Sequence, residues 1–189
     1  MFQTKNNHQK WAALTPSKGF TLLELLVVIG IIGLLASILV VNLTSARRKA
    51  RDTKRVADVR QLQAAVEDYY GKNGYYPTLI SALVTSQQIS MWPTDPLAPV
   101  NTVCSANGDN CYFLASYGTV PANPQYYHLG TSLEDPGTTN VLLSQDRDCN
   151  STVAGGTCPS NTVYANGFNG GDAAGCSGTP SRYCYDIAQ

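Results

Sequence analysis

The stretch "KGFTLLELLVVIGIIGLLASILVV" occupies residues 18–41, and the interpretation of the whole chain depends on it. Residues 25–41 carry no charged side chain, and a helix over them would be roughly 26 Å long, at the short end for a bilayer core. Glu24 stands immediately before them, although an ionisable group in hydrocarbon costs about 2.5–3.5 kcal/mol even on lenient scales. The stretch therefore predicts a membrane-spanning helix with one carboxylate that needs a counterpart.

The charge of the chain is unevenly distributed. The formal net charge of the 189 residues is zero, yet ten of the thirteen Lys and Arg residues lie in residues 1–60. From residue 71 onward, three basic residues stand against eight acidic ones. The length suffices for one domain with appendages. We infer that the basic, apolar front and the polar, mildly acidic back are built for different surroundings.

Residues 1–19 form a polar, lightly basic leader that ends in Gly19. A secretory signal peptide would place its small-residue cleavage site after the apolar stretch, whereas Gly19 comes before it. We therefore expect the apolar segment to stay with the mature chain.

A single long helix is predicted from about Phe20 to Tyr70. No proline occurs between Pro16 and Pro77, and Gly71, with Asn73 and Gly74 behind it, is the expected stop. The first half is apolar on every side, whereas the second half is amphipathic. Its apolar residues recur at spacings of three and four: Val56, Val59, Leu62, Val66 and Tyr69. This stripe must pack on residues 75–189.

The remainder predicts a short helix around Leu79 and Leu83, followed by an antiparallel sheet. Runs of strand-forming residues between turn-forming clusters give the strand candidates 112–117, 126–130, 141–144, 162–165 and 183–187. The expected fold is α+β, a roll in which the long helix covers one face of a small sheet. The predicted divisions are a leader (1–19), a transmembrane and assembly half (20–43), an amphipathic half with its exit (44–74) and an outer head (75–189).

All six cysteines lie in the head, at Cys104, Cys111, Cys149, Cys158, Cys176 and Cys184. No CxxC pair occurs, which disfavours a zinc site, and an even count predicts disulfides and an oxidising compartment. Six cysteines allow fifteen pairings. We expect first that neighbours in sequence pair, because each such pair closes a short loop between candidate strands. Buried free thiols are the alternative.

The combination of a basic leader ending in Gly19, then "FTLLE" and a long apolar helix resembles the prepilin cleavage and methylation signature. Type IV pilins and the pseudopilins of type II secretion share this signature. The resemblance is close over residues 15–45 and looser over residues 46–78. The C-terminal hundred residues match only in general plan.

The resemblance implies that a prepilin peptidase cuts between Gly19 and Phe20 and methylates the new amine. It also implies that Glu24 pairs with the N-terminal amine of a neighbouring subunit during assembly. A free α-amine titrates near pH 7.7–8.0, and opposite charges attract strongly in an apolar core. Alternatively, Glu24 favours its own helix N-terminus or pairs with its own amine.

The partners that the resemblance implies are other copies or related pilin subunits, the peptidase, an assembly ATPase and an inner-membrane platform. Before assembly the chain would cross the cell membrane once, with its head outside the cytoplasm. Afterwards it would belong to a periplasmic or extracellular filament. A membrane-anchored binding module that never polymerises is the second hypothesis.

A basic collar follows the apolar segment. The positive-inside rule would place it in the cytoplasm, whereas the cysteines and the resemblance place it outside. We expect it to face lipid headgroups or acids of neighbouring subunits, and nucleic-acid binding is disfavoured. Its members are Arg47, Arg48, Lys49, Arg51, Lys54 and Arg55.

The two branches of the family remain open. The lack of a proline in the apolar helix and the "PTDP" at 93–96 favour a pseudopilin, whereas six cysteines and a Gly-rich tail are not typical of those pseudopilins. No cofactor is expected.

A calcium loop is a weak candidate at Asp146, Asp148 and Asn150, which have D-x-D-x-N spacing. An EF-hand is excluded, because Ser151 and Thr157 stand where that motif needs Gly and Glu.

Enzyme activity is not expected. His128 lies in a strand-like run between tyrosines and is interpreted as a hydrogen-bonded structural residue, since no nucleophile and base pair stands out in the sequence.

Overall fold

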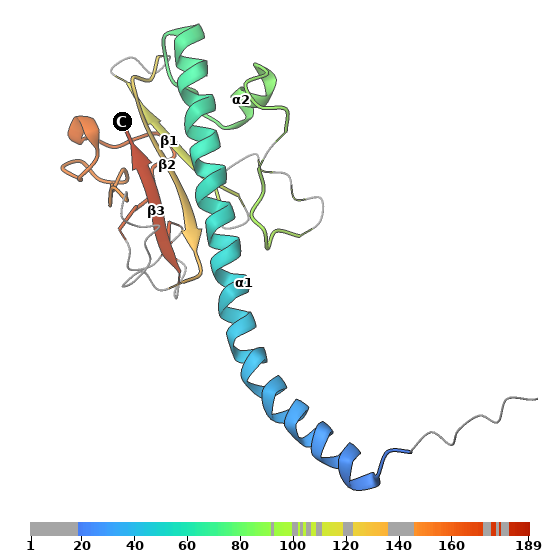
Figure 1. Ribbon diagram of the computed structural model, residues 1–189. Coiled ribbons are helices and arrows are strands. Elements are labelled where there is room, and N and C mark those ends of the chain that lie inside the picture. Colours follow the sequence, from blue (N-terminus) through green and yellow to red (C-terminus); the bar gives the residue numbers. More distant parts are fainter. Residues whose placement is uncertain are drawn as a thin grey trace, which may run out of the picture. The chain divides into compact units, whose positions relative to one another are not determined.

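The computed structural model describes residues 19–91, 93–99, 102, 104, 107–108, 111–118, 123–135, 146–171, 175–176, 178 and 182–189. The chain divides into two compact units, Met1–Leu43 and Thr44–Gln189. Figure 1 shows the elements, which also include a short 3₁₀ turn at Pro159–Asn161. They are α1 (Leu22–Asn73), α2 (Ser81–Thr85), β1 (Phe113–Tyr117), β2 (Tyr126–Leu133) and β3 (Tyr183–Ala188).

Helix α1 confirms the predicted long helix, but its end differs from the prediction. Gly71 was expected to stop the helix, yet it lies inside α1. The helix ends instead before Gly74, whose φ is 77° and whose N–H donates to the carbonyl of Tyr70 at 2.7 Å. A left-handed residue at this place closes a helix C-terminus, and glycine adopts that conformation without steric cost.

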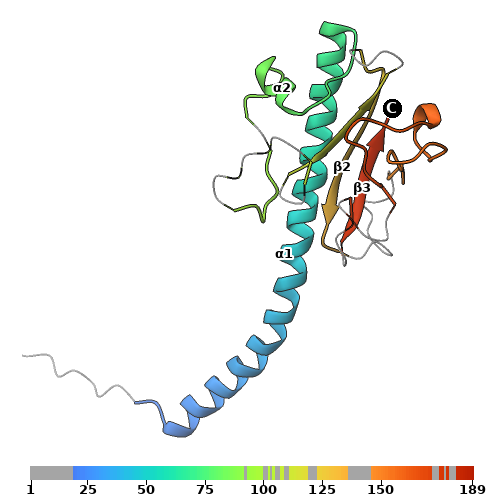
Figure 2. The same ribbon diagram turned by 180° about the vertical axis from the view of Figure 1, so that it is seen from behind.

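The second half of α1 packs its apolar stripe against the sheet, as predicted. Figure 2 shows this part of the helix alongside the sheet. Val59, Leu62 and Val66 are fully buried, and Tyr69 is half-buried at the edge of the same core. The strands contribute Leu114, Leu129 and Tyr185 to that core. Removing these apolar surfaces from water stabilises the contact, at roughly 25 cal/mol per Å².

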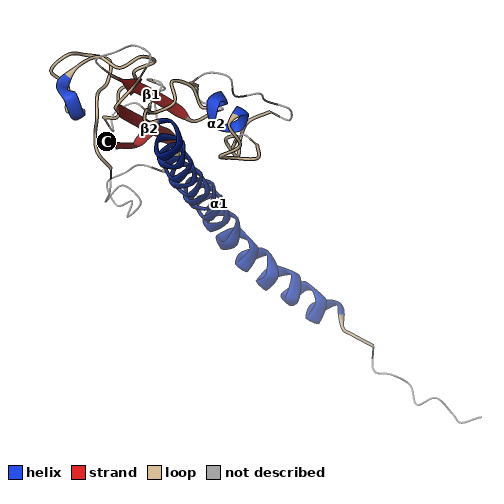
Figure 3. Ribbon diagram, turned by 90° about the horizontal axis from the view of Figure 1, so that it is seen from above, coloured by secondary structure: helices blue, strands red, loops and turns tan. Residues whose placement is uncertain are grey.

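The sheet is antiparallel, with the order β1-β2-β3. Because side chains alternate across a strand, Leu114 faces α1 whereas Phe113 and Ala115 lie on the opposite side. That opposite face carries a second core, made of aromatic residues and cysteines from the loops. Figure 3 shows the strands of the head from above, together with α1 and the surrounding loops. The α+β fold with disulfide-tied loops is confirmed.

Three of the predicted strands are observed as β1, β2 and β3, and the predicted short helix is observed as α2. The prediction of a strand at residues 162–165 was wrong. Only one isolated bridge forms there, between Ser116 and Ala165. The chain turns away at once, because Asn166 has a φ of 59° and Gly167 bonds back to Tyr164. The predicted strand 141–144 lies outside the described residues.

The three disulfides are those expected first: Cys104–Cys111, Cys149–Cys158 and Cys176–Cys184. Two of them contribute to the second core, where Phe168 lies over β2. A Cβ at Gly130 would stand 2.6 Å from the ring of Phe168, so this close approach requires glycine. These two disulfides hold irregular loops against a face of the sheet that α1 does not cover.

Candidate functional site

The residues predicted for processing and assembly, Gly19, Phe20 and Glu24, lie at the N-terminus of α1, and all three are exposed. The Oγ1 of Thr21 accepts a hydrogen bond from the N–H of Glu24 at 3.2 Å. In return, Oε2 of Glu24 lies 3.4 Å from the backbone nitrogen of Thr21. This reciprocal pair is a capping box, which satisfies two backbone donors that the helix leaves open. Glu24 therefore has a local structural role at the start of α1. Gly19 and Phe20 directly precede the box.

The first half of α1 exposes a continuous apolar surface. The large apolar side chains that the structure describes there are between 48% and 87% exposed. A contiguous apolar surface of this kind on a soluble protein marks a site of contact with a partner or a membrane. The residues are Phe20, Leu22, Leu23, Leu25, Leu26, Val27, Val28, Ile29, Ile31, Ile32, Leu34 and Leu35.

Within the part of the chain that the structure describes, no helix combines the length and the hydropathy of a membrane span.

Arg55 lies at the centre of a buried ionic cluster in the second unit. It is fully buried, and its Nε and Nη2 donate to the two carboxylate oxygens of Asp95 at 2.5 and 2.9 Å. Its Nη1 donates to Asp52 and to Glu134, each at 2.6 Å. A planar guanidinium can make all of these charge-assisted bonds at once, which an ammonium could not.

The cluster also attaches α1 to the end of β2. Arg51 donates from Nε and Nη2 to Glu134 at 2.8 and 2.5 Å. Asp52 accepts hydrogen bonds from the backbone nitrogens of Glu134 and Asp135, both at 3.0 Å. Two cations and three acids are thus joined across three segments that are far apart in sequence.

These contacts change the interpretation of the basic collar. Arg51 and Arg55 were expected to face lipid headgroups or neighbouring subunits, but they bind acids of their own chain. The physical reason is that Asp52, Asp95 and Glu134 converge on this part of α1. Burial alone lowers the pKa of Arg55, but its bonds with Asp95 and Glu134 outweigh this and raise the pKa.

The hydrogen bond from Arg51 holds the pKa of Glu134 well below its usual value, at about 2. Burial opposes this effect, and the hydrogen bond from Arg55 adds to it. Glu134 is therefore ionised at neutral pH.

Ser151, His128 and Asp186 are linked by hydrogen bonds through the imidazole, which suggests a catalytic triad, but they are buried beside the second core. His128 contacts Ser151 through Nδ1 and Asp186 through Nε2, each at 2.8 Å. All three side chains are fully buried, and the imidazole stacks on Phe168. Burial lowers the pKa of His128 to about 3, so the ring is neutral. With no access for a substrate, the arrangement is structural, as expected for His128.

Cys149 and Cys158 lie near His128, within 4.8 Å of one another's potential ligand atoms. Both sulfurs are joined in a disulfide, however, and only the thiolate is a metal ligand. This cluster therefore offers a metal one nitrogen only.

The calcium candidates take part in loop hydrogen bonds. Asp146 accepts from the backbone nitrogens of Arg147 and Asp186, at 3.0 and 2.7 Å. Asn150 accepts from Thr152, and Asp148 is exposed. A calcium site at these residues stays a prediction.

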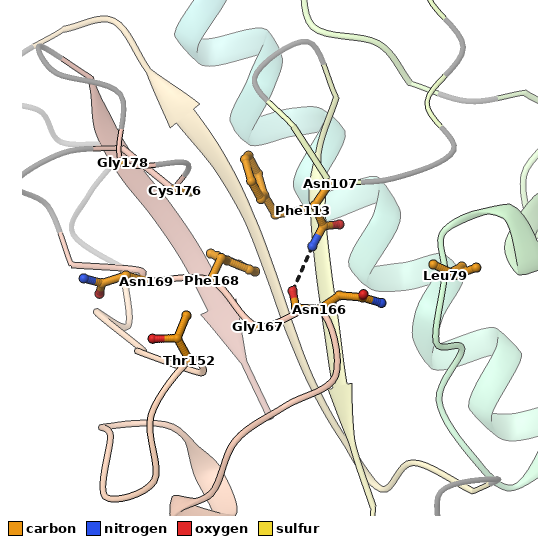
Figure 4. Close-up of a pocket in the computed structure, with 10 residues that line it drawn as sticks. All are labelled: Leu79, Asn107, Phe113, Thr152, Asn166, Gly167, Phe168, Asn169, Cys176 and Gly178. Atoms are coloured by element: carbon orange, nitrogen blue, oxygen red, sulfur yellow. Dashed lines mark hydrogen bonds between the residues drawn. The ribbon is translucent and has the colours of Figure 1, made fainter.

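A pocket of about 580 Å³ lies on the face of the sheet opposite α1 (Figure 4). Phe113 and Phe168 contribute its apolar part. Its amide groups are largely engaged already: Asn107 bonds to Leu114 and to the carbonyl of Asn166. The polar lining therefore stabilises the loops.

A helix with an exposed apolar first half and a second half packed on a small antiparallel sheet is consistent with an α+β pilin fold. Residues 14–40 match the family described as "Prokaryotic N-terminal methylation motif".

Three relatives extend this match. The type II secretion system core protein G of Escherichia coli K12 is 42% identical over 86 residues, which cover 46% of this chain and 58% of that protein. The protein of the same description from Vibrio cholerae is 43% identical over 81 residues, or 41% of this chain and 51% of that one. The type IV wide pilus major component PilA4 of Thermus thermophilus is 42% identical over 69 residues, or 36% and 53%.

The N-terminal part of the chain is thus similar to proteins of the pilin and pseudopilin family. It spans about half the length of the relatives it matches. No solved structure matches it significantly.

Sequence reasoning missed the ionic cluster. The spacing of Asp52 and Arg55 by three residues was an available signal, because such residues are neighbours on a helix. Asp95 and Glu134 gave no signal, since they lie 40 and 79 residues from Arg55.

Proposed function

We propose that this chain is a structural subunit of a type IV pilus-like filament. The observation that carries the proposal is the methylation motif at residues 14–40, joined to an apolar helix surface that the chain itself leaves exposed. In a filament, the apolar halves of many subunits bury this surface against one another. The disulfide-bonded heads remain outside. Head-to-tail association of this kind continues without closing, which gives a filament.

Processing between Gly19 and Phe20 supplies the charge that Glu24 needs. The new α-amine of Phe20 is mostly protonated at neutral pH. Each charge alone is costly in an apolar core, whereas the pair is mutually stabilising when the geometry is good. Pairing of Glu24 with the amine of a neighbouring subunit sets the axial register between the two. The partners are other pilin-like subunits, a prepilin peptidase, an assembly ATPase and an inner-membrane platform.

Before assembly, residues 20–43 hold the chain in the cell membrane, with the head outside the cytoplasm. The apolar side chains of this segment and the disulfides of the head support that orientation.

The test compares Glu24→Ala with Thr21→Val in sheared surface filaments. Thr21→Val removes the hydroxyl of the capping box but keeps the carboxylate, so it controls for helix capping. We expect Glu24→Ala to abolish filaments and Thr21→Val to retain them. Equal loss in both variants would assign Glu24 to capping alone. Unchanged filaments in Glu24→Ala, or no filaments in the unmodified strain, would favour a non-polymerising anchored module.

The mature N-terminus provides an independent check. Mass spectrometry of the purified protein should find N-methyl-phenylalanine at position 20. A mature protein that keeps residues 1–19 contradicts the processing step.

A second candidate is a pseudopilus subunit of type II secretion. The matches to core protein G from several bacteria favour it. Deletion of the gene separates the two candidates: a pseudopilus subunit is needed for the release of secreted enzymes into the medium, whereas a pilus subunit is needed for surface filaments.

A further inference from the structure

Three consecutive cations of α1, Arg47, Arg48 and Lys49, are exposed; we name them the free collar. Among the described residues, no acid forms a salt bridge with any of them. They differ in this from the rest of the basic collar, because Lys54 pairs with Asp58, and Arg51 and Arg55 bind the ionic cluster.

Exposure changes stepwise along one face of the helix. Arg47, Arg51 and Arg55 follow one another at intervals of four residues and share that face. Arg47 is exposed, the Arg51 side chain is 28% exposed and the Arg55 side chain is fully buried. The head therefore begins to cover α1 at Arg51, and the free collar lies just before that point.

The free collar is also placed next to the apolar half of the helix. Arg47 follows Leu43 by four residues, a rise of about 6 Å along the axis. Successive residues are rotated by about 100°, so the three cations spread over roughly 200° of the circumference. A single acid of a neighbouring protein could contact the cations on one side of the helix only. A layer of headgroups that surrounds the helix could contact all three.

We propose that the free collar binds the headgroups of anionic phospholipids while the subunit is held in the membrane. This inference rests on the membrane residence in the proposed function. The apolar half places the collar at the level of the headgroups. Long basic side chains there reach the phosphates while their methylene stems stay against apolar surface. The charges are complementary, and the contact accounts for three cations on the side that the positive-inside rule disfavours.

The test measures lipid selectivity on the full chain in mild detergent. The protein is incubated with equal amounts of phosphatidylglycerol and phosphatidylcholine that have the same acyl chains, and native mass spectrometry counts the lipid adducts. We expect phosphatidylglycerol to be preferred. The double variant Arg47→Gln/Arg48→Gln should lower the ratio by about fivefold or more, because one cation near an anionic lipid surface contributes roughly that factor.

Two controls make the result specific. Lys72→Gln/Arg147→Gln removes the same charge from other exposed positions and should leave the ratio unchanged. Arg47→Lys/Arg48→Lys keeps the charge and should keep most of the preference. All of these side chains are exposed, so we expect folded proteins with unchanged thermal unfolding.

Three outcomes would overturn the proposal. The double variant could keep the full preference for phosphatidylglycerol. It could keep the preference and lose filaments, which assigns the cations to acids of neighbouring subunits. The unmodified chain could show no lipid preference yet shift a DNA fragment on a gel in a manner that the double variant abolishes. The measurement uses monomeric protein, so a failure of filament assembly does not affect it.

Discussion

At the scale of the residue, Arg55 determines how three acids can be buried together. Its guanidinium bonds to Asp95, Asp52 and Glu134, and both it and Asp52 are fully buried. Such a cluster need not stabilise the fold relative to an apolar substitute of the same shape. Removing one partner, however, leaves buried charge without compensation.

We predict that Arg55→Met lowers the free energy of unfolding by about 3–5 kcal/mol, because the acids around it lose their counter-charge. Denaturant unfolding of the purified protein in mild detergent measures this. Lys54→Met is the matched control, since the Lys54 side chain is 56% exposed and its pair with Asp58 is worth about 0.2–1 kcal/mol. Similar losses of unfolding free energy in the two variants would show that the buried cluster contributes no more to stability than an exposed ion pair.

Glu134 should make the head sensitive to acid. Its pKa is about 2 in the folded protein, against an ordinary value of 4.5. A lowered pKa means that its contribution is complete above pH 4.5 and is lost as the pH falls toward 2.

We predict that the stability difference between the unmodified protein and Glu134→Gln shrinks over this range. Unfolding curves from pH 7 to pH 2 measure the difference. Asp68→Asn is the control, because the Asp68 side chain is 53% exposed in its pair with Lys72. A difference that stays constant down to pH 2 would contradict the assignment of the low pKa to Glu134.

At the scale of the element, the two glycines at the end of α1 play different roles. Gly71 lies within the helix, and a Cβ there meets nothing within 4 Å. Gly74 has equal space around it, but its φ of 77° is costly for any residue with a Cβ. Substitutions at these two glycines therefore test the effect of backbone conformation, because the space for a side chain is the same at both.

We predict opposite effects for the same substitution. Gly71→Ala should raise the free energy of unfolding by about 0.5–1 kcal/mol, because alanine loses less backbone entropy in a helix. Gly74→Ala should lower it by about 1–2 kcal/mol, because alanine is strained in the left-handed region. Thermal unfolding of both variants tests this, and a loss of stability in Gly71→Ala would place the helix end one turn earlier.

The edges of the sheet are covered by loops. The backbone of Ser116 in β1 exchanges hydrogen bonds with Ala165, at 2.9 and 3.2 Å. In β3 the N–H of Asp186 donates to the carboxylate of Asp146 at 2.7 Å, and the backbone carbonyl of Asp186 accepts from the N–H of Arg147 at 3.3 Å. Each edge strand thus has part of its backbone satisfied, which hinders pairing between heads through the sheet.

At the scale of the whole molecule, the second unit, Thr44–Gln189, contains a complete core of its own. The cluster that includes Leu62, Leu83, Leu129 and Tyr185 draws only on residues 44–189. The second core and all three disulfides belong to the same unit. The described residues of the first unit form an exposed apolar helix, and none of them belongs to either core.

We predict that a fragment of residues 44–189 folds alone. It should unfold cooperatively on heating, as followed by circular dichroism, with its disulfides formed. Leu62→Ala in this fragment should cost about 2–5 kcal/mol, because it leaves a cavity in the core. A fragment without a cooperative transition would show that residues 1–43 are needed for folding.

The sequence by itself determined the features that depend on neighbours along the chain. The apolar segment after Gly19 and the stripe through Leu62 are periodic patterns, and the two partners in each disulfide stand only seven to nine residues apart. Contacts between residues that are close in sequence can be predicted from the sequence, because helical spacing and the closure of short loops depend on nearby residues.

Only the tertiary structure decided which charges meet. Arg55 bonds to Glu134, which lies 79 residues away in sequence, and His128 bonds to Asp186, which lies 58 residues away. Ala165 bridges one strand without forming another. These contacts exist because the folding of the sheet onto α1 brings distant segments together, and a charged side chain gives no sign of its distant partner. The same packing buried Arg55 and left Arg47 exposed, although both belong to one run of basic residues.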